Sequence, residues 1–208
     1  MAVKALSKGA QTRDRICAAA ESIVLQKGFA ATSLDEIIET AGVTKSGFFY
    51  HFKDKHDLAK ALLARYIAHD DAIVDELFAK ADELIDDPLH AYLAYLKMLA
   101  GVMSDLPERH PGCLVASYCY QDQAYSREIR MLSVEGMLNW RARYRERLDR
   151  IVAKYPPRIA VDLDALADMT VTLVEGGIIL EKGHGASGAL AQQLLLQRDF
   201  IKMLFEPS

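Results

Sequence analysis

The chain has 208 residues, enough for one small and one larger domain, and 51% of them are hydrophobic. Glycine and proline are few, and β-type alternation is scarce, so an all-α protein is predicted. No apolar run approaches the length of a membrane span and no secretory leader is recognised, which excludes an integral membrane protein. Cys17, Cys113 and Cys119 show no zinc-ligand spacing, so we expect a cytoplasmic protein with no metal and no cofactor.

The formal net charge of −4 is unevenly distributed along the chain. Residues 1–60 contain nine Lys or Arg against seven Asp or Glu, whereas residues 61–208 contain 16 against 22. Four basic residues between Lys4 and Arg15, offset by a single Asp, make the N-terminal arm locally basic. A basic end on an acidic body suits a protein that contacts DNA at one end without wrapping it nonspecifically.

The segment 32–55 contains two short helical patterns joined by a glycine. Ser33 followed by Glu36 fits a capping box, and apolar residues then recur at the spacing of one helical face. Gly42 stands where a left-handed residue ends the first helix, because glycine adopts positive φ without a steric penalty from Cβ. Thr44 can cap a second short helix. The segment therefore predicts a helix-turn-helix, whose second helix enters the DNA major groove.

The second of these helices carries the side chains that a DNA-reading surface needs. Its first turn, from Lys45 to Gly47, is small or polar, and Lys45 is the one side chain there that can reach guanine acceptors. Phosphate contacts are expected from hydroxyl, imidazole and ammonium groups around the turn. The predicted DNA-binding residues are Ser33, Thr44, Lys45, Ser46, Gly47, Phe49, Tyr50, His51 and Lys55. By itself, the pattern is equally typical of an ordinary helical hairpin with a solvated basic loop.

The segment from about Thr12 to Leu58 resembles the DNA-binding domain of the tetracycline-repressor-like (TetR-type) transcriptional regulators. The motifs that carry the resemblance follow one another without a gap. They are Gly28-Phe29 after the first helix, Ala41-Gly42-Val43 after the second, the run Phe49-Tyr50-His51-Phe52, and then Lys53, Lys55 and Leu58. The resemblance implies a helix-turn-helix DNA-binding domain over residues 1–58 and a helical effector-binding and dimerisation domain over residues 59–208.

The recognition helix departs from the family's usual pattern at two pairs of positions. Residues 46–47 are Ser-Gly where Gly followed by Thr or Ser is usual, and residues 48–49 are Phe-Phe where Leu-Tyr is usual. Phe49 lacks the phenolic oxygen that would bond a phosphate, so this role is expected of Tyr50 and His51. These differences concern the base preference rather than the presence of the module.

Beyond the helix-turn-helix, the chain reads as a succession of helices separated by polar breaks, about nine helices in all. One long helix is expected from Asp54 to about Ala81, and Pro88 is expected in the first turn of the next. A break at 107–112 follows. The remaining helices are predicted from Cys113 to about Tyr120, Ser126 to Lys154, Asp162 to Lys182 and Ser187 to Phe205.

The last two predicted helices carry apolar stripes, and Gly176-Gly177 would let another helix approach closely. The stripe residues assigned to a subunit interface are Leu166, Met169, Leu173, Gly176, Leu180, Leu194 and Ile201. By pattern alone, such a stripe usually faces the protein's own core. The family resemblance implies instead a homodimer, in which the last two helices of each subunit form a four-helix bundle.

The middle helices contain side chains that suit a small-molecule pocket with a few polar points. The candidates are Met98, Met103, Cys113, Tyr118, Cys119, Trp140 and Glu175. Because this set is rich in sulfur and rings and poor in charge, we expect an apolar or aromatic effector. Met and aromatic residues at helical spacing are more often ordinary core, and structural thiols are commoner than redox-active ones.

These features predict a ligand-responsive DNA-binding transcriptional regulator, and specifically a repressor that a small molecule releases from a palindromic operator. Two alternatives remain open. One is a degenerate regulator that binds ligand or protein without DNA. The other is an all-α thiol enzyme that uses Cys113 with His110, although the chain lacks a phosphate loop, a metal-ligand spacing and a nucleophile elbow.

Overall fold

A computed structural model describes residues 7–106, 110–121, 125–185 and 188–206. These residues form nine helices and no strand, which confirms the predicted all-α class. The helices are α1 (Lys8–Lys27), α2 (Leu34–Thr40), α3 (Lys45–His51), α4 (Lys55–Leu84), α5 (Pro88–Ser104), α6 (Leu114–Tyr120), α7 (Arg127–Lys154), α8 (Leu163–His184) and α9 (Ala189–Phe205). Three predicted features lie outside the described residues: Lys4, part of the break at 107–112, and the helix start at Ser187.

The predicted helices are confirmed, with small shifts at their ends. α4 continues three residues past the predicted Ala81, because its stop is the polar segment that leads to Pro88. α8 continues two residues past the predicted Lys182, because Gly185, with φ of +70°, is the left-handed residue that ends it. Among the described helices, none is long and apolar enough to cross a membrane.

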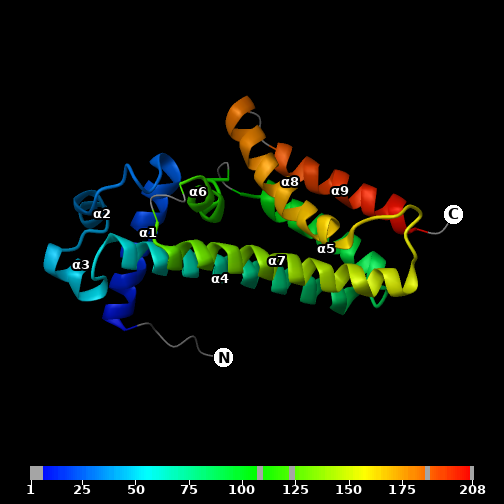
Figure 1. Ribbon diagram of the computed structural model, residues 1–208, viewed down its shortest axis with the longest axis horizontal. Coiled ribbons are helices and arrows are strands. Elements are labelled where there is room, and N and C mark those ends of the chain that lie inside the picture. Colours follow the sequence, from blue (N-terminus) through cyan, green and yellow to red (C-terminus); the bar gives the residue numbers. More distant parts are fainter. Residues whose placement is uncertain (1–6, 107–109, 122–124, 186–187, 207–208) are drawn as a thin grey trace. The chain divides into compact units, whose positions relative to one another are not determined.

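The chain forms two compact units, whose helices are labelled in Figure 1. Unit 1 consists of the residues up to Ala68 together with residues 111–134, and unit 2 of residues 69–110 and 135 onward. α4 and α7 each contribute residues to both units. The division differs from the boundary at residue 58 because the segment containing α6 packs with the N-terminal helices. The functional boundary at residue 58 stays a prediction.

An aromatic cluster joins α6 and the start of α7 to the N-terminal helices of unit 1. The ring centroids of Phe29 and Tyr125 lie 4.6 Å apart, and those of Tyr118 and Tyr125 lie 4.1 Å apart. The Tyr118 hydroxyl donates to the carbonyl oxygen of Ala59 at 3.0 Å. Burial of these rings explains why a segment distant in sequence belongs to the same unit as the helix-turn-helix.

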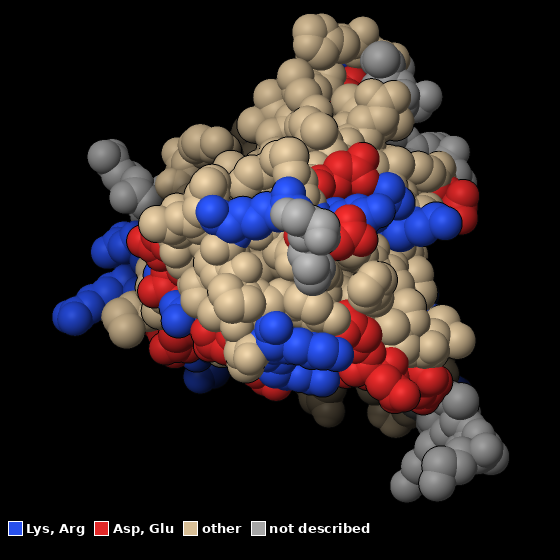
Figure 2. Space-filling model, turned by 90° about the vertical axis from the view of Figure 1, so that its right-hand side faces the viewer, with Lys and Arg blue, Asp and Glu red and all other residues tan. Residues whose placement is uncertain are grey.

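Unit 2 has an aromatic core between α4, α5 and α7. The rings of Phe78 and Tyr95 stack with centroids 3.8 Å apart, and the Tyr95 and Tyr144 hydroxyls lie 2.8 Å from each other. α9 packs against both α5 and α8. Acidic and basic side chains are interleaved over the end of this unit, as Figure 2 shows, so the face in view presents no large patch of one sign.

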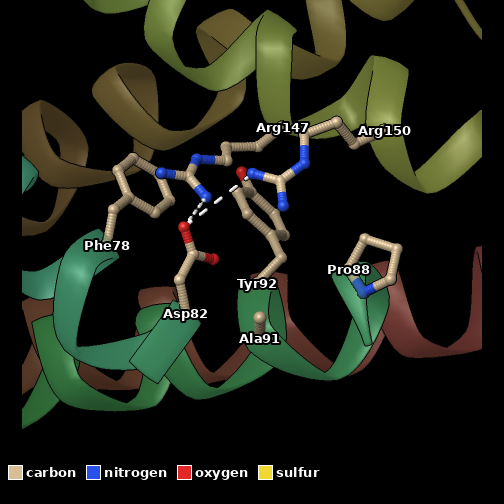
Figure 3. A pocket seen from close by; sticks show the side chains of 7 residues that line it. All are labelled: Phe78, Asp82, Pro88, Ala91, Tyr92, Arg147 and Arg150. Atoms are coloured by element: carbon tan, nitrogen blue, oxygen red, sulfur yellow. Dashed lines mark hydrogen bonds and ion pairs between the residues drawn. The ribbon is translucent and has the colours of Figure 1, made fainter. Parts of the chain in front are cut away.

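Arginines on α7 bind the flanking helices through two sets of ion pairs. On the α4 side, Arg143 forms a two-bond contact with Asp75 at 2.9 and 3.2 Å, and Arg147 donates to Asp82 at 2.5 Å (Figure 3). Arg143 and Arg147 are four residues apart, so their two guanidinium groups lie on one face of α7.

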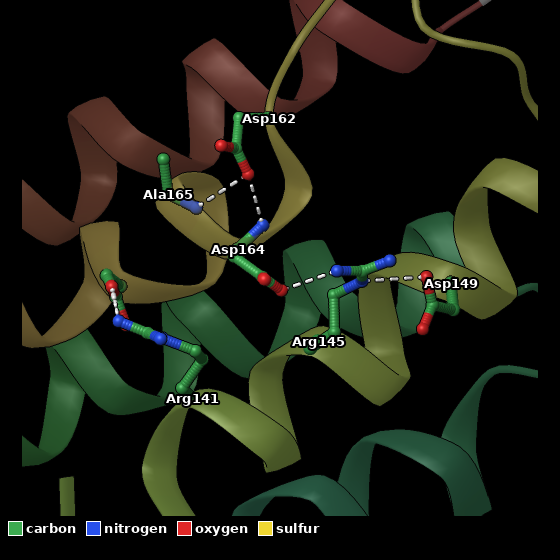
Figure 4. A network of polar contacts seen from close by, with 7 residues as sticks. Arg141, Arg145, Asp149, Asp162, Asp164 and Ala165 are labelled. Atoms are coloured by element: carbon green, nitrogen blue, oxygen red, sulfur yellow. Dashed lines mark hydrogen bonds and ion pairs between the residues drawn. The ribbon is translucent and has the colours of Figure 1, made fainter. Parts of the chain in front are cut away.

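The second set, Arg141 and Arg145, faces α8. Each of these arginines lies two residues before the corresponding arginine of the first set, and the two are again four residues apart. Arg141 donates to both carboxylate oxygens of Asp168 at 2.8 and 2.5 Å. Arg145 lies between Asp164 and Asp149 and donates to both (Figure 4). α7 is therefore held to its neighbours by polar pairs as well as by its buried residues.

The turn between α8 and α9 rests on one buried carboxylate and one glycine. Glu181 is buried, and its Oε1 accepts hydrogen bonds from the backbone N–H groups of Gly188 and Leu190 at 2.9 and 3.0 Å. Gly188, the residue that precedes α9, has no side chain to cap that helix, so Glu181 does so from α8. A Cβ atom on Gly177 would lie 2.6 Å from the Cα of Leu190, whereas one on Gly176 would meet nothing within 4 Å.

We predict different effects for alanine at Gly177 and at Gly183, another glycine of α8. Gly177→Ala should lower the free energy of unfolding by about 1–3 kcal/mol, because the added methyl group collides with the α9 backbone. Gly183→Ala, the matched control, should leave it unchanged or raise it by up to about 1 kcal/mol, because a Cβ atom there meets nothing within 4 Å and alanine favours the helix. Urea unfolding at equal protein concentration measures both, and equal midpoints for the two variants would contradict the close α8–α9 contact.

Candidate nucleic-acid interface

The helix-turn-helix of unit 1 consists of α2, the turn at Gly42 and α3. The Ser33 Oγ accepts from the N–H of Glu36 at 3.2 Å, while the Glu36 carboxylate binds the Lys27 ammonium at 2.5 Å. Only the serine half of the predicted capping box therefore forms among the described residues. Gly42 has a φ of +62°, as the sequence predicts, and the N–H of Val43 donates to the carbonyl of Ile38 at 3.2 Å.

Two phenylalanines fix which face of α3 points outward. Phe48 and Phe52 are buried, with 0% and 1% of their surface exposed, and their rings pack 5.7 Å apart. The guanidinium of Arg13, from α1, lies 4.9 Å from the Phe52 ring centroid. Because α3 has 3.6 residues per turn, burying this side exposes the opposite one.

Four of the predicted DNA-binding residues of α3 have exposed side chains. They are Lys45, Ser46, Phe49 and Tyr50. Tyr50 is 83% exposed, and its ring makes an edge contact with the half-buried His51 at 5.0 Å. Exposed aromatic rings beside hydroxyl and ammonium groups suit a surface that contacts a partner.

The other predicted residues of this site have structural partners in unit 1. The Thr44 hydroxyl caps α3 by accepting from the N–H of Gly47 at 3.1 Å, and Ser33 caps α2. Both side chains remain exposed at their helix starts. Gly47 has little free space, since a Cβ there would lie 3.2 Å from the Thr44 hydroxyl oxygen.

Lys55 has a role that the sequence pattern does not reveal. Its ammonium donates to the carbonyl oxygen of Phe29 at 2.6 Å and lies 4.2 Å from the centroid of the Phe29 ring. Burial lowers the pKa of Lys55 below its ordinary value, and the nearby charge of Lys27 lowers it further. Lys55 therefore ties the first turn of α4 to the turn after α1, and two of its three donors remain for other contacts.

The predicted effector residues divide between the two units. In unit 1, Tyr118 is buried and Cys119 is exposed, while Cys113 precedes α6 and its Sγ accepts from the N–H of Ala116 at 3.4 Å. Burial raises the pKa of the Tyr118 hydroxyl above its ordinary value. The sequence gives no signal for the capping contact of Cys113, because cysteine is not a usual cap.

In unit 2, the Trp140 indole N–H donates to Asp71 at 3.1 Å, and Met98, Met103 and Glu175 are half-buried. A separate small pocket, with a cavity volume of about 10 Å³, opens between α4, α5 and α7. Figure 3 shows Arg147 and Arg150 both directed at Asp82 in this pocket. None of its lining residues was predicted to contact an effector; they are Phe78, Asp82, Pro88, Ala91, Tyr92, Arg147 and Arg150.

The residues predicted for a subunit interface fall into two groups. Leu166, Leu194 and Ile201 are buried within this chain, at 4%, 0% and 0% exposure. Met169, Leu173 and Gly176 are half-buried, and Leu180 is exposed. Other apolar side chains of α8 and α9 are exposed as well: Ile179, Leu195, Leu196 and Met203.

Comparison with known proteins agrees with this architecture. Residues 16–62 match the family model described as bacterial regulatory proteins, tetR family. The chain is 27% identical over 160 residues to the transcriptional regulator AcuR of Cereibacter sphaeroides, a match that covers 76% of this chain and 70% of AcuR. It is 32% identical over 81 residues to the transcriptional repressor NemR of Escherichia coli K12, covering 39% of this chain and 41% of NemR.

The fold is also found in solved structures. A TetR-family transcriptional regulator from Agrobacterium tumefaciens superposes with a TM-score of 0.77 at 20% identity, covering 95% of this chain and all of that chain. At this level of identity the likeness establishes the fold. The family model covers the helix-turn-helix, and the structural match extends over the remaining helices. The family match identifies residues 16–62 as a DNA-binding domain of the tetR family, and together the motif, the fold and the relatives support a DNA-binding transcriptional regulator of the TetR type.

Proposed function

We propose that this protein is a dimeric repressor that binds a palindromic operator through α3 and leaves it when a small molecule binds the helical domain. The observation that carries the proposal is that α3 buries Phe48 in unit 1 while the side chains of Lys45, Ser46, Phe49 and Tyr50 remain exposed. The matched relative NemR is named a repressor, which supports repression over activation.

The predicted DNA contacts divide into base contacts and phosphate contacts. Lys45, Ser46 and Gly47 enter the major groove, where Lys45 bonds the O6 and N7 acceptors of a guanine. Phosphates are held by residues at the helix starts and on the outer side of the turn. These are Ser33, Thr44, Tyr50, His51 and Lys55, while Phe49 supplies apolar contact beside them.

We predict that Lys45→Ala and Tyr50→Phe affect DNA binding in different ways. Lys45→Ala should cost about 1–3 kcal/mol on the operator and relax the preference at one base pair. Tyr50→Phe should weaken operator and random duplexes by the same factor, because a phosphate contact carries no sequence information. Titration of labelled duplexes measures both. Equal losses on operator and random DNA for Lys45→Ala would refute its assignment to a base, and a wild-type protein that shifts no DNA would favour the degenerate regulator.

Dimerisation should use the exposed apolar side chains of α8 and α9. Ile179, Leu196 and Met203 are all more than half exposed on these two helices, which is unfavourable for an isolated subunit. Gly176 lies on α8 with open space around its Cα, so a second helix can approach there. A dimer also suits the DNA site, because one helix-turn-helix reads too few base pairs for specific binding.

We predict that Leu196→Asp separates the subunits. Leu196 is 64% exposed, and a carboxylate there would be buried without a partner in the proposed four-helix interface. Leu138→Asp is the matched control, because Leu138 is also exposed (51%) but lies on α7. Light scattering should report a monomer for Leu196→Asp alone, with unchanged helicity. A dimer for both variants, or a monomer for both, would place the interface elsewhere.

The effector proposal rests on the composition of the candidate residues and on the length of α4, which belongs to both units. An apolar or aromatic effector suits Met98, Met103 and Trp140, and Glu175 can bond a cationic or hydroxyl group on it. α4 begins four residues after α3 ends and contributes residues to both units. A ligand that changes the position of α4 in unit 2 therefore acts on the helix that directly follows the recognition helix in the chain. Half-sites lie about 34–36 Å apart, so a displacement of a few ångströms breaks one of the two contacts.

Ligand and operator should weaken each other's binding by the same factor. We expect a coupling of about 1–3 kcal/mol, because a ligand shifts the equilibrium only by its differential affinity for the two states. Isothermal titration of an aromatic compound found by thermal-shift screening, with and without operator duplex, measures this directly. A series of binders with identical affinity in both conditions would refute induction. Covalent turnover of such a compound would instead support the enzyme alternative at Cys113.

A further inference from the structure

We propose that Asp35 and Lys45 act together to read a single G·C base pair. The Lys45 ammonium lies 3.8 Å from an Asp35 carboxylate oxygen, and the two side chains are 71% and 86% exposed. They come from different helices, the first turn of α2 and the first turn of α3. Neither side chain forms a hydrogen bond with another described residue. The inference rests on the proposed function, because it assigns a target to the Lys45 of that site.

The neighbouring acid shows why Asp35 is unusual. Glu36 is bound to the Lys27 ammonium at 2.5 Å, and the pKa of Glu36 is lowered by that contact. Among the described residues, the ion pair of Asp35 is the longer one with Lys45, at 3.8 Å. An exposed ion pair of this kind stabilises a fold little, so its members are available to a partner. A carboxylate beside a DNA-reading lysine is repelled by phosphates. A hydrogen bond donated to it by a base would offset that repulsion.

The major-groove edge of a G·C pair matches this arrangement of charges. Guanine presents two neighbouring acceptors, N7 and O6, and cytosine presents the N4 amino donor beside them. O6 and N4 are hydrogen-bonded to each other within the pair, so they lie about 3 Å apart. A cation and an anion 3.8 Å apart can therefore meet the guanine acceptors and the cytosine donor at the same time.

An A·T pair does not match as well. Its single donor, adenine N6, lies between two acceptors, and the thymine methyl group stands at the pyrimidine side. A carboxylate that reaches N6 brings its charge close to both acceptors. An inverted C·G pair exchanges the positions of donor and acceptors, so the fixed order of Asp35 and Lys45 also distinguishes the two orientations.

The test begins with an operator selected from random duplexes by the wild-type protein. Each base pair of the half-site is then varied, and binding is measured for wild type, Asp35→Ala, Lys45→Ala and the double variant. We expect both single variants to lose about tenfold discrimination at the same G·C pair in each half-site. The double variant should lose little more than either one, because the two residues read one base pair.

Glu39→Gln is the matched control for loss of a negative charge, because Glu39 is an exposed acid on the same helix. It should keep the wild-type preference at every position. Asp35→Asn is the second variant, in case alanine in the first turn of α2 prevents folding. Asparagine bonds adenine N6 and N7, so its preference at this position should move towards A·T.

The outcomes separate this inference from the function on which it depends. A wild-type protein that selects no sequence refutes the proposed function itself. If wild type selects an operator, unchanged discrimination in Asp35→Ala and Asp35→Asn overturns the inference alone. Loss at a base pair other than the one affected by Lys45→Ala also overturns it, since the two residues would then read separate positions.

Discussion

The DNA-facing surface depends on the burial of Phe48 and Phe52. Each ring removed from water stabilises unit 1 by about 1.5–3 kcal/mol, and the two lie four residues apart, Phe48 within α3 and Phe52 directly after its end. A seven-residue helix has too few backbone bonds to be stable alone, so this packing holds it in place. Tyr50 is exposed because it lies two residues from each ring and so points to the opposite side of the helix. Lys45 is exposed because it is the first residue of α3, one turn before Phe48.

Unit 2 is organised by a helix that is unusually polar for its position. α7 carries many charged residues, and its arginines reach α4 in one direction and α8 in the other. Exposed ion pairs contribute little singly, but the paired contacts of Arg141 and Arg143 fix direction as well as distance. The buried rings of Phe78 and Tyr144 supply the apolar contact beneath them. The polar pairs thus set how α7 lies, while the aromatic core supplies most of the stability.

The α8–α9 hairpin shows how adjacent residues can serve different surfaces. Gly177 allows α9 of the same chain to approach, and Glu181 supplies the cap that the start of α9 lacks. Gly176, one residue away, faces open space. Because successive residues of a helix point about 100° apart, one pair of glycines can permit an internal contact and leave a second surface free for another subunit.

The sequence by itself determined the all-α class, the helix starts at Thr44 and Pro88, and the left-handed turn at Gly42, because caps, prolines and positive-φ glycines act through neighbouring residues. Periodicity also placed an apolar stripe on α9. Only the tertiary structure decided which neighbour that stripe meets, and it buries Leu194 within the chain. It likewise decided that Lys55 binds Phe29, since burial and ion pairing depend on residues brought together from distant positions.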